Sequence, residues 1–179
     1  MPGAAHCRRR RVDVGELLRE IVSVVAIEAD ARGCLIDVQA APGLVVSGDA
    51  ELLRSAFENV IRNAVRYSPP GATVAVEGRQ GSATETEREP VQVTVDDRGP
   101  GVPEKDLGLI FEPFYRAEVA REHRSGGGEG LGLAIAARAV ALHGGSIVAR
   151  NRDGGGLAVT VSLPGAARED SQPKSAAAA

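Results

Sequence analysis

Residues 49–67 read DAELLRSAFENVIRNAVRY, and their pattern predicts a long amphipathic helix. Asp49 is a suitable N-cap, and the run SPPG at residues 68–71 ends the helix. The apolar residues recur at spacings of three and four, as expected for one buried helix face: Leu52, Leu53, Phe57, Val60, Ile61 and Ala64.

Two asparagines in this helix need an explanation. Asn59 and Asn63 are four residues apart, so they share one face. Asparagine is a mediocre helix former, but its carboxamide oxygen can bind Mg²⁺ and its NH₂ group can reach a phosphate oxygen. Arg62 and Arg66 add positive charge nearby. A polar stripe that faces solvent explains the asparagine pair equally well.

Outward from this helix, helical and strand patterns are mixed. Two further helices are expected, with Asp13 and Gly33 capping the first. The expected elements are the helices at 12–32 and 131–142, a helical turn at 104–111, and strands at 34–39, 44–46, 73–77, 91–95, 146–150 and 157–163. The polar segment 78–90 reads as a mobile hairpin loop. This order favours an α+β fold, in which helices cover one face of a mixed sheet.

The strand at 91–95 leads into Asp97-Arg98-Gly99-Pro100-Gly101. An aspartate at the end of a strand can accept a hydrogen bond from a buried exocyclic amine, and Gly99 and Gly101 let a flat ring approach the backbone. Val102 adds an apolar wall. Taken alone, the pentapeptide is more typical of an ordinary Asp-Gly turn.

Two more segments point to a ligand. The glycine-rich run 126–132 continues directly into an apolar helix, so its backbone N–H groups and the helix N-terminus could bind an anion. A flexible linker is the alternative. Residues 111–116, FEPFYR, gather two of the three phenylalanines and one of the two tyrosines. They are expected to anchor a mobile segment or to pack in the core.

Composition limits the remaining possibilities. The chain has 179 residues and a net charge of −3, which argues against a nucleic-acid-binding surface. Its sequence contains no apolar run long enough to cross a membrane, and no GxxxxGK[ST] phosphate loop. Cys7 and Cys34 form no metal or disulfide pattern, so a reducing cytoplasm is expected. We expect a basic linker or tail at residues 1–11, one domain at 12–165 and a disordered tail at 166–179.

Together, these motifs resemble the catalytic domain of sensor histidine kinases over about residues 12–164. Residues 59–67, 97–101, 111–116 and 128–133 resemble its N, G1, F and G2 boxes in order. The stretch 111–135 looks closest to the Cpx-type envelope-stress kinases. The resemblance implies the Bergerat ATP-binding fold, a two-layer α/β sandwich with a flexible ATP lid at about residues 114–128.

The resemblance also implies roles for individual residues. Asp97 would hold the adenine amino group, Asn63 would bind Mg²⁺, and Asn59 and Arg66 would meet the phosphates as catalytic residues. Arg116 is the further catalytic candidate, although Arg121 and Arg124 of the lid could reach the γ-phosphate as well. The remaining expected ATP contacts are Tyr67, Gly99, Gly101, Val102, Phe114, Gly128, Gly130, Leu131, Gly132 and Leu133. Glu129 departs from the family pattern, because a carboxylate beside a triphosphate is repulsive unless it pairs with an arginine.

The implied activity is an ATP-dependent protein-histidine kinase. The phosphoacceptor would be a histidine on a dimerisation domain that this chain lacks, because His6, His123 and His143 have no His-Glu helix context. A response regulator would be the indirect partner. The chain itself would contact neither nucleic acid nor membrane, and its parent kinase would be anchored in the inner membrane.

Two alternatives stay open at this stage. One is a nucleotide-binding regulatory module without kinase activity. The other is an ATPase or anti-sigma-type serine kinase of the same fold, which would carry a glutamate where Asn59 stands. Glu58 is one residue away, about 100° round the helix, and would point elsewhere.

Overall fold

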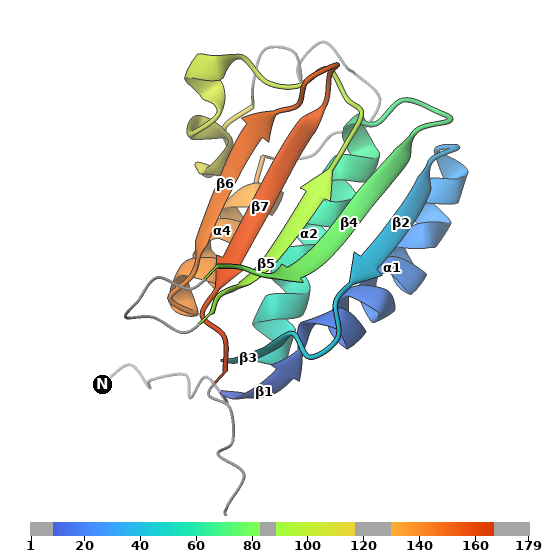
Figure 1. Ribbon diagram of the computed structural model, residues 1–179. Helices are drawn as coiled ribbons and strands as arrows, with labels where there is room; N and C mark the ends of the chain where they lie inside the picture. The colour runs from blue at the N-terminus through green and yellow to red at the C-terminus, as the bar shows by residue number, and fades with distance from the viewer. Residues whose placement is uncertain (1–8, 83–88, 117–129, 167–179) are drawn as a thin grey trace, which may run out of the picture.

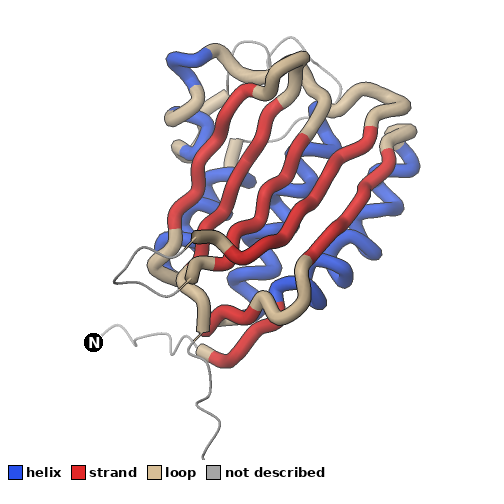
Figure 2. The backbone as a smooth tube through the Cα atoms, viewed as in Figure 1, coloured by secondary structure: helices blue, strands red, loops and turns tan. Residues whose placement is uncertain are grey.

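The computed structural model describes residues 9–82, 89–116 and 130–166. Within these residues, three α-helices cover one face of a five-stranded sheet (Figures 1 and 2). The helices are α1 (Val14–Ala31), α2 (Ala50–Tyr67) and α4 (Gly132–Leu142). The predicted α+β fold with helices on one face of a mixed sheet is therefore confirmed.

The sheet has the strand order β2-β4-β5-β7-β6. Its strands are β2 (Leu35–Ala40), β4 (Thr73–Gln80), β5 (Val91–Asp96), β6 (Ser146–Asn151) and β7 (Leu157–Leu163). Only β2 and β4 pair in parallel, and the other three pairs are antiparallel. A separate antiparallel pair, β1 (Arg10–Asp13) and β3 (Val45–Gly48), lies at the lower end in Figure 1.

Alternation along the strands separates the two faces of the sheet. On β5 and β7 every second residue is buried, and these residues are valines and leucines that face the helices. The core between the layers is aliphatic, with Phe57 of α2 as its one buried aromatic ring among the described residues. The other face carries polar side chains such as Thr94 and Thr160, whose hydroxyl groups lie 3.1 Å apart.

The predicted helix caps are present. The Asp13 side chain accepts a hydrogen bond from the Glu16 N–H, and Asp49 accepts from the N–H groups of Glu51 and Leu52. Gly33 follows α1 with a φ of +70°, which lets the chain turn directly into β2.

Two short 3₁₀ turns, η1 (Glu104–Asp106) and η2 (Leu109–Phe111), stand where one helical turn was expected.

The N-terminal boundary differs from the expected one. Arg10 and Arg11, which the sequence assigned to the tail, pair with Gly48 and Ser47 as part of β1. The strand β4 likewise runs to Gln80, into the segment that was expected to be a loop. Both extensions depend on pairing with distant strands, which local periodicity does not report. Most of the expected tails, 1–8 and 167–179, lies outside the described residues.

Candidate functional site

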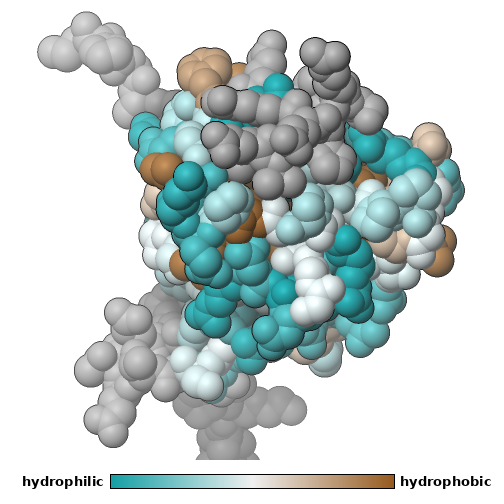
Figure 3. Space-filling view, turned by 90° about the horizontal axis from the view of Figure 1, so that it is seen from above, coloured by the Kyte–Doolittle hydropathy of each residue, from teal (hydrophilic) through white to brown (hydrophobic). Residues whose placement is uncertain are grey.

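A cavity of about 310 Å³ opens at the upper end of the fold in Figure 1, between α2, α4 and the loop that follows β5. This size suits a small-molecule ligand. Its described lining residues are Asn59, Arg62, Asn63, Arg66, Tyr67, Asp97, Pro100, Gly101, Val102, Ile110, Tyr115, Arg116, Gly130, Leu131, Gly132, Leu133, Ile135 and Leu157. Viewed from above, this end of the molecule is mainly hydrophilic, with scattered apolar side chains (Figure 3).

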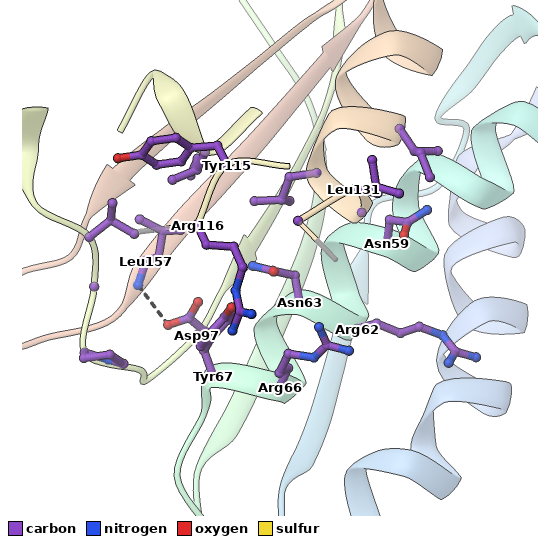
Figure 4. A pocket seen from close by; sticks show the side chains of 18 residues that line it. Asn59, Arg62, Asn63, Arg66, Tyr67, Asp97, Tyr115, Arg116, Leu131 and Leu157 are labelled. Atoms are coloured by element: carbon purple, nitrogen blue, oxygen red, sulfur yellow. Dashed lines mark hydrogen bonds between the residues drawn. The ribbon is translucent and has the colours of Figure 1, made fainter. Parts of the chain in front are cut away.

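The pocket has two chemically different ends. In the close view, Asp97 and Leu157 lie on one side, Asn59 and Arg62 on the other, and Asn63 between them (Figure 4). The described lining contains three guanidinium groups, from Arg62, Arg66 and Arg116, and a single carboxylate. This excess of positive charge favours an anionic ligand.

Asp97 is held rigidly by neighbouring backbone. It is only 4% exposed, and its Oδ1 accepts hydrogen bonds from the N–H groups of Gly99 (2.8 Å) and Leu157 (2.9 Å). Its Oδ2 makes no hydrogen bond with any residue that the structure describes. The second oxygen is therefore available to accept a hydrogen bond from a ligand.

Burial also affects the protonation of this group. Desolvation raises the pKa of Asp97 above its ordinary value, and the backbone donors of Gly99 and Leu157 partly offset that rise by stabilising the charged form. The Arg152 charge acts in the same direction as these donors. A buried carboxylate with one oxygen left to a ligand is a recognition group whose strength depends on pH.

Close contacts within the protein leave no room for a side chain at the two glycines beside Asp97. A Cβ atom on Gly99 would lie 2.8 Å from the Tyr67 carbonyl oxygen, and one on Gly101 would lie 2.7 Å from Asn151 Oδ1. Gly101 also has a φ of +75°. The sequence explained both glycines by the close approach of a flat ring, whereas the structure adds close contacts with α2 and β6.

The opposite end of the pocket is a face of α2. The Asn59 Nδ2 donates to the Ser55 carbonyl at 2.8 Å, which orients its Oδ1 towards α4. A Cβ atom on Gly132 would lie 3.0 Å from that oxygen, so glycine lets the start of α4 approach Asn59 closely. Arg62 lies at the rim, where it pairs with Glu58 and Glu28.

A backbone hydrogen bond joins the segments on either side of residues 117–129. The Phe114 N–H donates to the Gly130 carbonyl at 3.0 Å. Gly130 has a φ of +73°, and a Cβ atom there would lie 2.7 Å from the Tyr115 carbonyl oxygen. Phe114 is 73% exposed and has a φ of +65°, which is unusual for a residue other than glycine. Tyr115 and Arg116, which line the pocket, are therefore positioned by this junction.

Most of the sequence-predicted site residues meet in the pocket. Twelve of them line it: Asn59, Asn63, Arg66, Tyr67, Asp97, Gly101, Val102, Arg116, Gly130, Leu131, Gly132 and Leu133. Gly99 and Phe114 lie beside lining residues but do not line it themselves. Gly128, Glu129 and most of the expected lid lie outside the described residues.

Sequence reasoning missed the contribution of the β6–β7 hairpin. Leu157 donates to Asp97, and a Cβ atom on Gly156 would lie 2.1 Å from the Asp97 carbonyl oxygen. Three consecutive glycines at 154–156, more than a tight turn requires, were the available signal. The apolar lining residues Ile110 and Ile135 carried no signal of their own.

His143 has a structural role. It is 7% exposed, its Nδ1 lies 2.7 Å from the Ala139 carbonyl oxygen, and its Nε2 accepts a hydrogen bond from the Asp49 N–H at 2.9 Å. It therefore joins the end of α4 to the start of α2. His6 and His123 lie outside the described residues.

The donor groups of the pocket fit a metal ion only together with a ligand. Within the described residues, no three His, Cys, Asp or Glu side chains are grouped to hold a metal. Asn63 offers one carboxamide oxygen in a pocket that favours anions. Mg²⁺ commonly binds through one or two protein oxygens, substrate phosphates and water, so this set suits Mg²⁺ that arrives with a polyphosphate.

Comparison with known proteins agrees with this geometry. Residues 48–167 match the family described as histidine kinase-, DNA gyrase B-, and HSP90-like ATPase. The sensor histidine kinase CpxA of Escherichia coli (strain K12) is 37% identical over 154 residues, which are 86% of this chain and 32% of CpxA. Other curated relatives are also histidine kinases, and the chain spans 32% to 39% of the length of these relatives.

Solved structures of histidine kinases have a similar fold. The mycobacterial sensor histidine kinase MprB has a TM-score of 0.75 and 30% identity, with 89% of this chain and 99% of that one covered. Full-length ShkA in complex with AMPPNP has a TM-score of 0.74 and 29% identity, covering 93% of this chain and 33% of ShkA. None of the helices in the described ranges is both long and apolar enough to cross a bilayer.

Proposed function

Since the chain belongs to the family of histidine kinase-, DNA gyrase B-, and HSP90-like ATPases, we propose that it is the catalytic domain of a sensor histidine kinase. It binds ATP with Mg²⁺ and transfers the γ-phosphoryl group to a histidine on a dimerisation and phosphoacceptor domain. The observation that carries this proposal is the two-ended pocket, with a buried carboxylate at one end and carboxamide and guanidinium groups at the other.

At the base end, Asp97 accepts a hydrogen bond from the adenine amino group through Oδ2, because Oδ1 already accepts two backbone donors. Val102, Ile110 and Leu157 supply apolar surface around the ring. The AMPPNP bound to the related ShkA supports this choice of nucleotide, since AMPPNP is an ATP analogue.

At the phosphate end, Asn63 binds the Mg²⁺ that accompanies ATP, and Asn59 lies beside the phosphates. Arg66 and Arg116 neutralise charge on the transferred group. Mg²⁺ supplies further charge neutralisation. Backbone N–H groups of Gly130, Leu131 and Gly132 face the triphosphate at the start of α4, where a helix N-terminus favours anions.

The reaction depends on positioning and charge neutralisation. The bond between the γ-phosphorus and its bridging oxygen breaks as the acceptor imidazole nitrogen bonds to phosphorus. ADP leaves with the electron pair of the broken bond, and the proton on the other nitrogen of the acceptor imidazole passes to a base on the acceptor domain. The described lining contains no carboxylate at the phosphate end to activate water, and Glu58 pairs with Arg62 instead of lining the pocket.

The partners follow from this role. The direct partner is the histidine-bearing dimerisation domain, and a response regulator receives the phosphoryl group from it. The domain works in the cytoplasm as part of a longer kinase anchored in the inner membrane, in keeping with its relatives being sensor kinases.

Phosphotransfer to the cognate dimerisation domain tests this function. The purified chain is mixed with that domain and with ATP labelled at the γ-phosphate, with and without Mg²⁺. We expect an acid-labile, base-stable phosphohistidine on the dimerisation domain that requires Mg²⁺. Nucleotide binding without transfer would instead indicate a regulatory module, and steady phosphate release by the isolated chain would indicate an ATPase.

A further inference from the structure

Two consecutive residues at the end of β6 contact the Asp97–Val102 loop from outside the pocket. Neither Asn151 nor Arg152 lines the cavity, and neither belongs to the motifs by which the sequence resembles its family. Both nevertheless bind the main chain of the loop that carries the base-recognition carboxylate.

Asn151 binds the far end of this loop with both atoms of its carboxamide. Its Oδ1 accepts from the Val102 N–H at 2.9 Å, and its Nδ2 donates to the Val102 carbonyl at 2.7 Å. Its Nδ2 also lies 3.3 Å from Glu104 Oε1. The side chain thus pairs with Val102 as a neighbouring strand would, and it fixes the position of a residue that lines the pocket.

The absence of a side chain on Gly101 makes this clamp possible. Asn151 Oδ1 occupies space that any Cβ atom on Gly101 would need, since the two would be 2.7 Å apart. The second glycine of the loop and the asparagine of β6 therefore form one packing unit. Asn151 is exposed and could hydrogen-bond to water instead. Its two hydrogen bonds to Val102 therefore fix the orientation of a side chain that would otherwise be free to rotate.

Arg152 binds the near end of the same loop. Its Nη1 donates to the Asp97 carbonyl oxygen at 2.8 Å, and its Nε lies 3.3 Å from Asp96 Oδ2. The other oxygen of Asp96 is buried without a hydrogen-bond partner among the described residues. Loss of Arg152 would leave this carboxylate without its ion pair, directly beside Asp97, so the strand end would be expected to shift.

We propose that Asn151 and Arg152 are positioning residues that set the preference of the pocket for a 6-aminopurine over a 6-oxopurine. This inference rests on the proposed function, because it concerns the base end of the same ATP pocket. With Oδ1 occupied, Asp97 presents one acceptor oxygen at a fixed place. A 6-amino group can donate to it, whereas a 6-oxo group would bring two acceptors together. Selection requires that the carboxylate cannot move away, and the two clamps prevent that movement.

The test compares nucleotides that differ at this position. Binding of Mg-ATP and Mg-ITP is measured by calorimetry for the chain and for Asn151→Ala, with Arg150→Ala as the control from the same strand, where the side chain is exposed. We expect Asn151→Ala to weaken ATP binding about tenfold. ITP binding should change by less than about threefold, because it gains nothing from the fixed carboxylate. Arg150→Ala should leave both affinities unchanged.

A second variant keeps the inference testable if Asn151→Ala does not fold. Arg152→Gln retains a side chain that can donate to the Asp97 carbonyl but loses the ion pair with Asp96. It should lower the ATP-to-ITP preference below that of the unmodified chain, and thermal unfolding reports whether each variant is folded. A parallel loss of both nucleotides in folded variants, or an unchanged preference, would overturn the inference. Absence of ATP binding by the unmodified chain would instead overturn the proposed function.

Discussion

The two ends of the pocket are built in different ways. The base end is assembled from β5, β7, the hairpin between β6 and β7, and the end of α2, and backbone donors fix its carboxylate. The phosphate end is largely one face of α2, with side chains at four-residue spacing that are partly exposed. A change at the base end should therefore alter recognition, and a change at the phosphate end should alter chemistry.

The largest expected effect is at the base end. Asp97→Asn keeps the size of the side chain but removes its charge. If its amide oxygen takes over the two backbone donors, its NH₂ faces the adenine amino group. We expect ATP affinity to fall about 100-fold, measured by calorimetry.

The melting temperature of this variant should stay close to that of the unmodified chain, because the two hydrogen bonds accepted at this position are retained. Near-unchanged ATP affinity would refute the assignment of the base end.

The next effect separates chemistry from binding. Asn63→Ala removes the carboxamide proposed to bind Mg²⁺, so phosphotransfer in the presence of the dimerisation domain should fall on the order of 10- to 100-fold. ADP affinity without Mg²⁺ should change only about twofold, since the base end is untouched. A loss of ADP affinity as large as the loss of phosphotransfer in this variant would contradict the separation of the pocket into a base end and a phosphate end.

A smaller effect on ATP affinity is expected at Gly130, where the segments before and after residues 117–129 are joined by a backbone hydrogen bond. Gly130→Ala places a Cβ atom 2.7 Å from the Tyr115 carbonyl oxygen and strains a φ of +73°. Tyr115 and Arg116 must then shift, and we expect ATP affinity to fall about fivefold.

Gly43→Ala is the matched control for Gly130→Ala. Its φ is +76°, but no atom lies within 4 Å of the added Cβ. It should lower stability by about 1 kcal/mol without changing affinity. Equal effects of the two variants on affinity would mean that backbone strain, rather than the shift of Tyr115, is responsible.

The smallest effect is a pH dependence with opposite signs for binding and folding. Because burial raises the pKa of Asp97 in the folded state, the folded protein binds this proton more readily than the unfolded chain does. The contribution of Asp97 to stability is therefore greatest at low pH and declines as pH rises from its ordinary pKa through its raised one.

ATP affinity should change the other way, falling by a few-fold as pH drops towards the raised pKa, since the carboxylate must be charged to accept the amine strongly. Calorimetry and thermal unfolding of the apo protein, each compared with Asp97→Asn, isolate this group. An identical pH profile in the two proteins would contradict the raised pKa.

Local pattern explains why so much of the phosphate end was predictable. Helical periodicity places Asn59, Asn63 and Arg66 on the same or neighbouring faces of the helix. The N-caps Asp13 and Asp49 accept hydrogen bonds from residues only two or three positions away. The same reasoning predicted the α+β class and the valine strand that leads to Asp97. The strand β1 and the length of β4 were not predictable in this way, because both depend on pairing between distant segments.

The sequence by itself determined the helices, the alternating strands and the order of the ATP-site motifs, since each depends on interactions between residues close in the chain. Only the tertiary structure decided that Asn151, Arg152 and Gly156 would surround the Asp97 loop. These residues are about 50 to 60 positions from Asp97 and meet it because β7 pairs with β5 and β6 pairs with β7. The physical reason is that hydrogen bonds between paired strands set which distant residues become neighbours, and no local pattern encodes that choice.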